Sequence, residues 1–175
     1  MKYAFLFLSL CLHTVYAQQP APSNNKAERL QIAAAMENSL QKELLLQWYP
    51  RCFDTVYGGF TSSYTYDFNP ALNQDKMIVT QARHTWVNAK AAALYPSVTY
   101  YKTGAKHGFL FLKDVMWDKT YGGFYTLVDQ TGKTKKNGFA EKEAYGNAFG
   151  IYALAAYYKM SGDTAALNLA KRAFA

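Results

Sequence analysis

Apolar residues recur along this chain at spacings of three and four, and short glycine- and proline-rich stretches separate the runs. Such spacing is typical of amphipathic helices, and the residue before a proline tends to leave the α region, which ends a helix. We expect Gly104 or Gly108 to interrupt the third helix and Asp163 to cap the fifth. The pattern predicts five helices, at about residues 27–48, 76–94, 97–115, 141–160 and 164–175.

Two segments of seven residues repeat each other between these helices. They read Asp-Thr-Val-Tyr-Gly-Gly-Phe at 54–60 and Asp-Lys-Thr-Tyr-Gly-Gly-Phe at 118–124, and each follows an aromatic residue. Paired glycines permit positive φ or a close approach of the backbone. Thr-Ser-Ser-Tyr-Thr-Tyr, at 61–66, alternates as a short strand does. Each segment is therefore expected to open a short β-hairpin.

The helices that follow the two segments also correspond, so the chain contains a repeat. Stacked helical repeats build toroids and solenoids. We therefore predict an all-α fold, an α/α toroid with about two and a half helical-hairpin repeats and short β-hairpins. The matched residues of the first helix are Lys76, Gln81, Ala82 and Trp86, and those of the second are Lys142, Asn147, Ala148 and Tyr152.

The N-terminus differs from the rest of the chain. Residues 1–17 contain one lysine, a short apolar run and an Ala17 ending typical of a secretory signal peptide. The alternative is a membrane anchor, but the run is shorter than the roughly 20 residues that cross a bilayer. A polar linker, 18–26, would follow. We expect an exported protein, periplasmic or extracellular, without a membrane segment after cleavage.

Residues 27–175 form the predicted α/α domain. The last helix stops without a capping residue or a closing repeat, whereas terminal repeats need a polar cap. The domain is therefore interpreted as the N-terminal part of a larger closed barrel, apparently truncated. The alternative is a short solenoid that ends in a frayed helix.

Charge and cysteine content exclude several kinds of function. The net charge of +7 falls to +6 when Lys2 leaves with the signal peptide. The basic cluster at 133–136 is interpreted as a solvated turn rather than an anion site, because no recognition motif accompanies it, and no nucleic-acid partner is expected. Cys52 would be the one remaining cysteine, which predicts a buried structural thiol. No sequence motif for a metal or a cofactor is present, so neither is expected.

One helical face carries the strongest chemical signal. Arg83, Trp86 and Lys90 lie three and four residues apart, so they share a face. Arginine can donate two hydrogen bonds to a polar ligand, and tryptophan can stack on a sugar ring. The alternative is that Arg83 satisfies nearby loop carbonyls.

Further residues could face the same cavity if the inner helices surround it. Tyr145 and Asn147 begin the fourth helix, and Tyr125 is a weaker candidate. Alternatively, Tyr145 is an aromatic residue of the rim. The 15 tyrosines suit such a wet, ring-lined cleft. We therefore expect a small-molecule carbohydrate as the partner.

Three segments, at 81–96, 105–132 and 142–170, together resemble the N-acylglucosamine 2-epimerase / cellobiose 2-epimerase family. The resemblance runs from about Leu30 to the end. It implies an (α/α)6 barrel and an isomerase that transfers a proton at C2 of a free or reducing-end sugar. The substrates it implies are of the N-acylglucosamine, cellobiose, mannobiose or mannose type.

The same resemblance assigns two catalytic residues. Arg83, in Gln-Ala-Arg-x-x-Trp, corresponds to the family arginine that polarises the sugar oxygens, and Tyr145, in Lys-x-x-Tyr-Gly-x-Ala-Phe, corresponds to an active-site tyrosine. Trp86, Asn147 and Tyr125 are expected to bind the substrate from their positions in the repeat, not from the resemblance. The family's catalytic histidines belong to the second half of the barrel, and neither His84 nor His107 lies in a matching motif.

Two other classes of function remain open. A glycoside hydrolase or lyase could use the same barrel, but a hydrolase needs two carboxylates across the bond. Asp54 and Asp118 lie in turns, and Glu37 and Glu43 lie on an outer helix, which argues against it. The second class is a non-catalytic carbohydrate-binding fragment.

Signal cleavage makes a first testable prediction. The protein isolated from its native source should begin at Gln18, because a signal peptidase would cut after Ala17. N-terminal sequencing together with the intact mass measures this directly. A native protein that still begins at Met1 would contradict the prediction.

Overall fold

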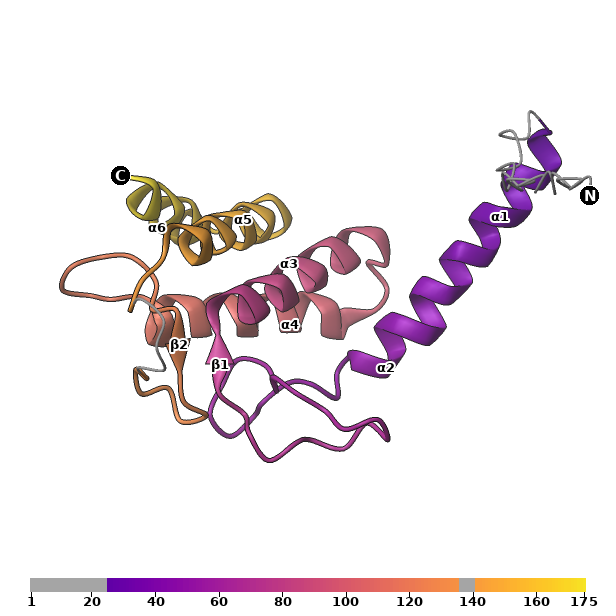
Figure 1. The fold of residues 1–175 in the computed structure, drawn as a ribbon. Coiled ribbons are helices and arrows are strands. Elements are labelled where there is room, and N and C mark those ends of the chain that lie inside the picture. The colour runs from indigo at the N-terminus through magenta and orange to yellow at the C-terminus, as the bar shows by residue number, and fades with distance from the viewer. Residues whose placement is uncertain (1–24, 136–140) are drawn as a thin grey trace, which may run out of the picture.

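The computed structural model describes residues 25–135 and 141–175 (Figure 1). Asn25 caps the first helix, and residues 1–24, with the expected signal peptide and most of the linker, lie outside the described residues. The helices are α1 (Lys26–Asn38), η1 (Ser39–Leu45), α2 (Leu46–Trp48), α3 (Ile78–Leu94), α4 (Thr99–Phe111), η2 (Leu112–Met116), α5 (Ala144–Ser161) and α6 (Thr164–Phe174), and the strands are β1 (Lys76–Met77) and β2 (Leu127–Val128).

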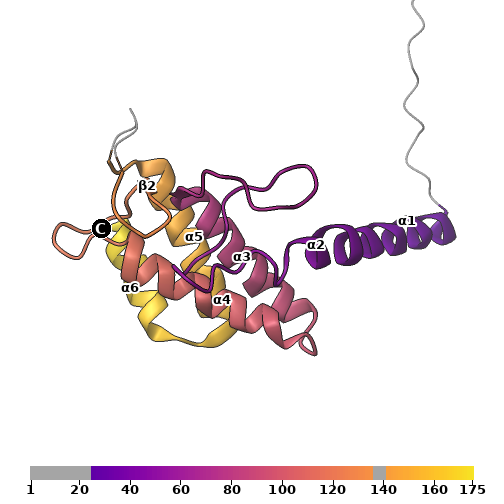
Figure 2. The same ribbon diagram turned by 90° about the horizontal axis from the view of Figure 1, so that it is seen from below.

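Four helices form the body of the molecule. Helix α3 packs against both α4 and α5, and α5 packs against α6 (Figures 1 and 2). The five predicted helical segments are thus present, although η1 and η2 are π-helical continuations of α1 and α4. Asp163 caps α6 through the N–H of Ala165, as predicted.

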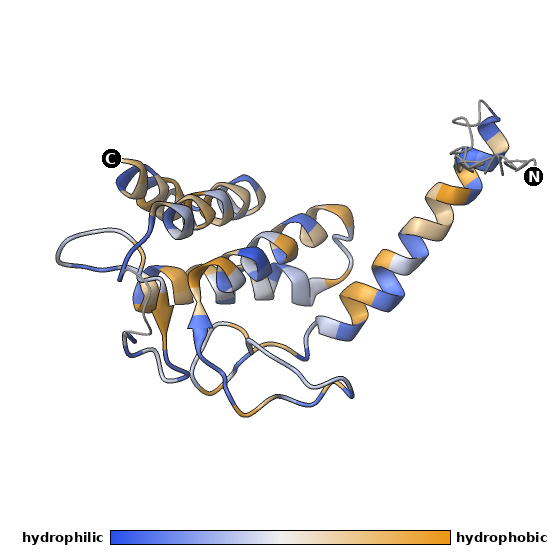
Figure 3. Cartoon of the chain, in the orientation of Figure 1, coloured by the Kyte–Doolittle hydropathy of each residue, from blue (hydrophilic) through white to orange (hydrophobic). Residues whose placement is uncertain are grey.

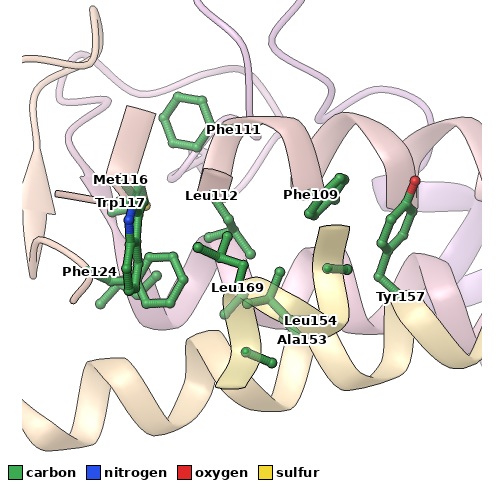
Figure 4. Close-up of a cluster of buried hydrophobic side chains, with 14 of the residues drawn as sticks. Phe109, Phe111, Leu112, Met116, Trp117, Phe124, Ala153, Leu154, Tyr157 and Leu169 are labelled. Atoms are coloured by element: carbon green, nitrogen blue, oxygen red, sulfur yellow. The ribbon is translucent and has the colours of Figure 1, made fainter. Parts of the chain in front are cut away.

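The main core lies where these helices meet (Figure 4). Phe109 of α4 stacks on Tyr157 of α5 with ring centroids 4.5 Å apart, and Leu112, Leu154 and Leu169 fill the space beside them. Burial of such side chains contributes about 1.5–3 kcal/mol each. This core fixes α5 and α6 against α4.

The predicted interruption at Gly104 or Gly108 is wrong, because α4 continues through both. A Cβ at Gly104 would lie 2.3 Å from Asn88 Oδ1, and one at Gly108 would lie 2.1 Å from Thr85 Oγ1. The two glycines therefore let α4 approach α3 closely; they do not bend the helix.

The repeated seven-residue segments form the same turn twice. The Oδ1 atom of Asp54 accepts hydrogen bonds from the N–H groups of residues 56 and 57, and that of Asp118 accepts from residues 120 and 121. Both glycines of each pair have φ between +68° and +80°. Bridges between residues 53 and 60 and between 117 and 124 close the two turns. The matched residues thus have matched structural roles.

Each turn is tied to the inner helix that follows it by a lysine. The buried Nζ of Lys76 donates to Asp54 Oδ2 at 2.7 Å and to the carbonyl of Gly58 at 2.6 Å. It also donates to the carbonyl of Gln130, in the second repeat, at 3.2 Å. Hydrogen bonding to Lys76 and to backbone N–H groups outweighs the effect of burial and lowers the pKa of Asp54.

Lys142 repeats this arrangement in the second unit. Its amine donates to Asp118 Oδ2 and, at 2.8 Å, to the carbonyl of Gly122. The hydrogen bond from Lys142 lowers the pKa of Asp118 to about 2. Lys142 is 26% exposed, whereas Lys76 is fully buried.

The expected β-hairpins are present only as isolated antiparallel bridges, between residues 53 and 60 and between 64 and 70 in the first unit, and between 117 and 124 and between 128 and 134 in the second. Between residues 61 and 75 the Gln74 side chain adds to the backbone hydrogen bonds of this short bridge: it accepts from the N–H of Ser62 and donates to the carbonyls of Ser63 and Ala71. In the described residues the two-residue strands pair between repeats, with β1 antiparallel to β2. The sheet thus links the two units.

Helix α1 projects away from the body in both views (Figures 1 and 2). None of its residues is buried, and the apolar side chains of Leu30, Ile32 and Met36 are exposed. Hydrophobic segments alternate with hydrophilic ones along this helix (Figure 3). No helix within 25–135 and 141–175 is both long and apolar enough to cross a membrane.

The Lys76 ion pair makes the second prediction. Lys76→Met should lower the free energy of unfolding by about 3 kcal/mol, because it leaves a largely buried Asp54 carboxylate without its partner. Lys142→Met should cost less, since its amine is partly exposed. Urea unfolding followed by circular dichroism measures both, with the exposed Lys102→Met on α4 as the control. Equal effects of all three substitutions would contradict the prediction.

Candidate functional site

A cavity of about 660 Å³ lies between α3 and α5. Three of the five predicted site residues, Arg83, Trp86 and Tyr145, line it together. Val87, Ala148, Phe149 and Tyr152 complete its wall. Arg83 is the one charged group among these residues, and no carboxylate is among them.

Arg83 is exposed to the cavity. Its guanidinium carbon lies 4.9 Å from the ring centroid of Phe149, and within the described part of the chain it has neither a hydrogen bond nor an ion pair. Arg83 therefore does not donate a hydrogen bond to any loop carbonyl among the described residues. Its N–H donors are available to a polar ligand.

Trp86 stacks on Tyr152 across the two repeats. Their ring centroids are 5.1 Å apart and their planes differ by 17°. The amine of Lys90 lies 5.5 Å from the Trp86 ring centroid. Because Trp86 and Tyr152 are equivalent positions of the repeat, 66 residues apart, the repeat itself builds this aromatic wall.

Tyr145 begins α5 and is 61% exposed. Its ring meets that of Phe149 edge-on, with centroids 5.0 Å apart. Its hydroxyl makes no hydrogen bond to the residues that the structure describes, so it can donate to or accept from a ligand. Tyr145 thus lies at the cavity, which agrees both with a ligand-binding role and with the alternative of an aromatic residue at the rim.

Asn147 and Tyr125 are not among the residues that line the cavity. The Asn147 amide accepts from the N–H of Phe124 at 2.8 Å and donates to the carbonyl of Glu143 at 2.9 Å, so it serves the turn. The ring of Tyr125 lies 5.2 Å from the Lys142 amine. A role for either residue in substrate binding stays a prediction, because neither one lines the cavity.

The sequence analysis missed Phe149 and Tyr152 as cavity residues. The repeat could have found both, because the offset of 66 that relates Lys76 to Lys142 also relates Arg83 to Phe149 and Trp86 to Tyr152. The equivalent residues of each pair contact each other between α3 and α5.

A second groove, of about 370 Å³, adjoins the cavity and shares Arg83 and Val87 with it. It is lined by His84 and Tyr49 and by apolar residues of η1 and α2. Burial lowers the pKa of His84 to about 4, so the ring is neutral at pH 7. The Tyr49 hydroxyl lies 2.7 Å from His84 Nδ1.

Cys52 and His107, two other reactive side chains in the described ranges, are held in the packed interior or hydrogen-bonded to the backbone, away from the cavity. Burial raises the pKa of the Cys52 thiol to about 12, and this cysteine is fully buried, as predicted. His107 Nε2 donates to the carbonyl of Gly59 at 2.6 Å, away from the cavity. Across residues 25–135 and 141–175, no three metal-ligating side chains gather into a candidate metal site.

Comparison with known proteins identifies the family. The sequence model of N-acylglucosamine 2-epimerase (GlcNAc 2-epimerase) matches residues 58–175. The chain belongs to this family. The matched range includes both repeated inner helices and every residue that lines the cavity.

Individual relatives agree with the family assignment. The chain is 32% identical over 142 residues to a cellobiose 2-epimerase of Ruminococcus albus, covering 79% of this chain and 36% of that protein. It is 32% identical to the cellobiose 2-epimerase structure from Spirochaeta thermophila, with a TM-score of 0.76 over 87% of this chain and 37% of the other. The chain therefore spans about a third of the length of these relatives.

The predicted fold class is confirmed. The mostly helical structure matches the (α/α)6-barrel epimerase structures. The crystal structure of a D-mannose isomerase, 22% identical with a TM-score of 0.66 over 83% of this chain and 34% of the other, shares the fold.

The buried His84 makes the third prediction. Its folded-state pKa lies below the unfolded value of about 6.5, so the unfolded chain binds its proton more tightly. This contribution to stability is complete above about pH 6.5 and is lost as the pH falls toward 4, by an amount on the order of 3 kcal/mol. Urea unfolding measured between pH 7 and pH 4 tests it.

His84→Asn supplies the control for that experiment. The variant should be less stable at pH 7 but should lose most of the dependence on pH between 6.5 and 4. A histidine ring signal of His84 that titrates near pH 6.5 in the folded protein would contradict the prediction.

Proposed function

We propose that the full-length protein is a sugar 2-epimerase or isomerase of the cellobiose 2-epimerase type, and that this chain supplies one wall of its substrate cavity. The observation that carries the proposal is the meeting of Arg83 and Tyr145, which lie in the segments that resemble the family, with Trp86 in a single cavity. Residues 62 positions apart in the sequence converge there because α3 and α5 pack side by side.

The chemistry of these side chains suits proton transfer at C2 of a sugar. Removal of that proton develops negative charge on the sugar oxygens as an enediolate forms. The Arg83 guanidinium, with no other acceptor in the described chain, would stabilise that charge. The Tyr145 hydroxyl would hydrogen-bond a neighbouring sugar oxygen, and Trp86 would pack beside the ring.

The proton-transferring groups would be histidines outside these 175 residues, as the family resemblance implies. His84 is neutral, largely buried and hydrogen-bonded to Tyr49, and His107 faces the Gly59 carbonyl. Neither one lines the cavity. Both rings therefore serve the packing of the first repeat in this proposal.

The proposed substrate is a free or reducing-end sugar, and cellobiose is the first to test, because several relatives are named cellobiose 2-epimerase. N-acylglucosamine, mannobiose and mannose are the next. No redox cofactor is required, since the hydrogen moves as a proton. Hydrolysis would need two carboxylates from outside the described cavity wall, because none of the residues that line it is acidic. We also propose that the mature protein is exported.

Deuterium exchange tests the reaction. The full-length protein in D₂O should incorporate deuterium at C2 of its substrate and form the C2 epimer or the ketose, both followed by NMR. Release of monosaccharide from cellobiose without an epimer would favour a hydrolase. Sugar binding without exchange or release would favour a binding protein.

Substitutions in the cavity make the fourth prediction. Arg83→Met should lower kcat about 100-fold or more, because it removes donors aimed at the developing charge. Tyr145→Phe should lower kcat/KM about tenfold by removing one hydrogen bond to the substrate.

Matched controls are available on exposed sites. Arg29→Met, on α1, and Tyr66→Phe, in the first loop, change the same residue types away from the cavity and should leave the activity unchanged. Steady-state kinetics of all four variants measures the difference. An Arg83→Met variant with wild-type kcat would remove Arg83 from the mechanism.

A further inference from the structure

Phe149 lies between Arg83 and Tyr145 in the wall of the cavity. Its ring centroid is 4.9 Å from the Arg83 guanidinium carbon and 5.0 Å from the Tyr145 ring centroid, and the two aromatic planes are 70° apart. Its ring is partly buried and packs against the main core. Phe149 is thus anchored on one side and touches both Arg83 and Tyr145 on the other.

The contact with Arg83 crosses from one repeat to the next. Arg83 belongs to α3 and Phe149 to α5, and the two occupy equivalent positions of the repeat. A guanidinium over an aromatic face is attracted by the ring quadrupole. Because Arg83 has no hydrogen bond or ion pair in the described chain, this ring supplies the charge-specific contact that limits its rotamers.

The contact with Tyr145 lies within α5. Residues four apart face each other on a helix, and edge-to-face packing is a favoured geometry of aromatic pairs. Tyr145 is largely exposed, so its ring would otherwise turn freely. One side chain therefore restrains both groups that are expected to meet the sugar.

We propose that Phe149 is a positioning residue that holds the Arg83 guanidinium and the Tyr145 ring at the spacing needed to meet neighbouring sugar oxygens. The part that concerns sugar rests on the proposed function. The holding of Arg83 does not, and it can be measured without activity.

The first measurement is the NMR signal of the Arg83 side chain in the ¹⁵N-labelled full-length protein. Arg83→Lys identifies the signal by its loss. Protons above an aromatic face are shielded, so Phe149→Leu should move the signal toward the position of a free arginine. Phe149→Tyr, which keeps the ring, should retain the shift. Phe174→Leu on α6, which is 86% exposed in this chain and does not line the cavity, is the matched control and should leave the Arg83 signal unchanged.

The second measurement is the rate of C2 exchange. Phe149→Leu should lower kcat about tenfold with a smaller change in KM, because a misplaced donor weakens the transition state more than substrate binding. Phe149→Tyr should restore most of kcat. Phe149→Leu added to Arg83→Met should cost far less than it does alone, since the two residues would act as one unit.

The outcomes separate the two proposals. An Arg83 signal unaffected by Phe149→Leu would overturn the positioning role, whatever the activity. A shifted signal with unchanged kcat would overturn it too, because the reaction would not need the contact. If the wild-type protein exchanges no sugar proton, the proposed function fails, and the NMR shifts still decide whether Phe149 holds Arg83.

Discussion

A lysine amine placed between a turn and the start of an inner helix is the interaction on which the rest of this structure depends. Burying the Lys76 amine is costly unless acceptors replace water, and Asp54 with two carbonyls does so. The Gly-Gly turns supply some of these acceptors. Gly58 and Gly122 have positive φ, and their carbonyls accept hydrogen bonds from Lys76 and Lys142. We call each of these interactions, Lys76 with Asp54 and Lys142 with Asp118, a lysine latch. The two latches fix where α3 and α5 begin.

The position of the cavity follows from this latch. Arg83 and Phe149 each lie seven residues, about two helical turns, after the lysine of their repeat. The two latches are alike, so the two helices present equivalent faces to each other. Arg83 then meets Phe149, and Trp86 meets Tyr152. At this position the repeats differ, with arginine in the first and phenylalanine in the second, and the arginine supplies a cationic donor beside the aromatic rings.

Much of this arrangement could be predicted from the sequence. Periodicity gave the helices within a few residues, because apolar spacing reports which face is buried. The repeat predicted that the two turns and inner helices are alike. Arg83, Trp86 and Tyr145 were placed in one cavity, and the structure brings them together. The hydrogen bonds of Asn147 to the turn could not be predicted, since an amide can equally well bind a ligand in a cavity or backbone groups of a turn.

The sequence by itself therefore determined the helices, the repeat and the family, since each depends on residue types at fixed spacing along the chain. The tertiary structure alone decided how segments far apart meet. It showed that Gly104 and Gly108 serve close helix packing, that β1 pairs with β2 of the other repeat, and that Phe149 lies between Arg83 and Tyr145. These contacts depend on the distance and rotation between helices, which packing and the lysine latches set and local sequence does not.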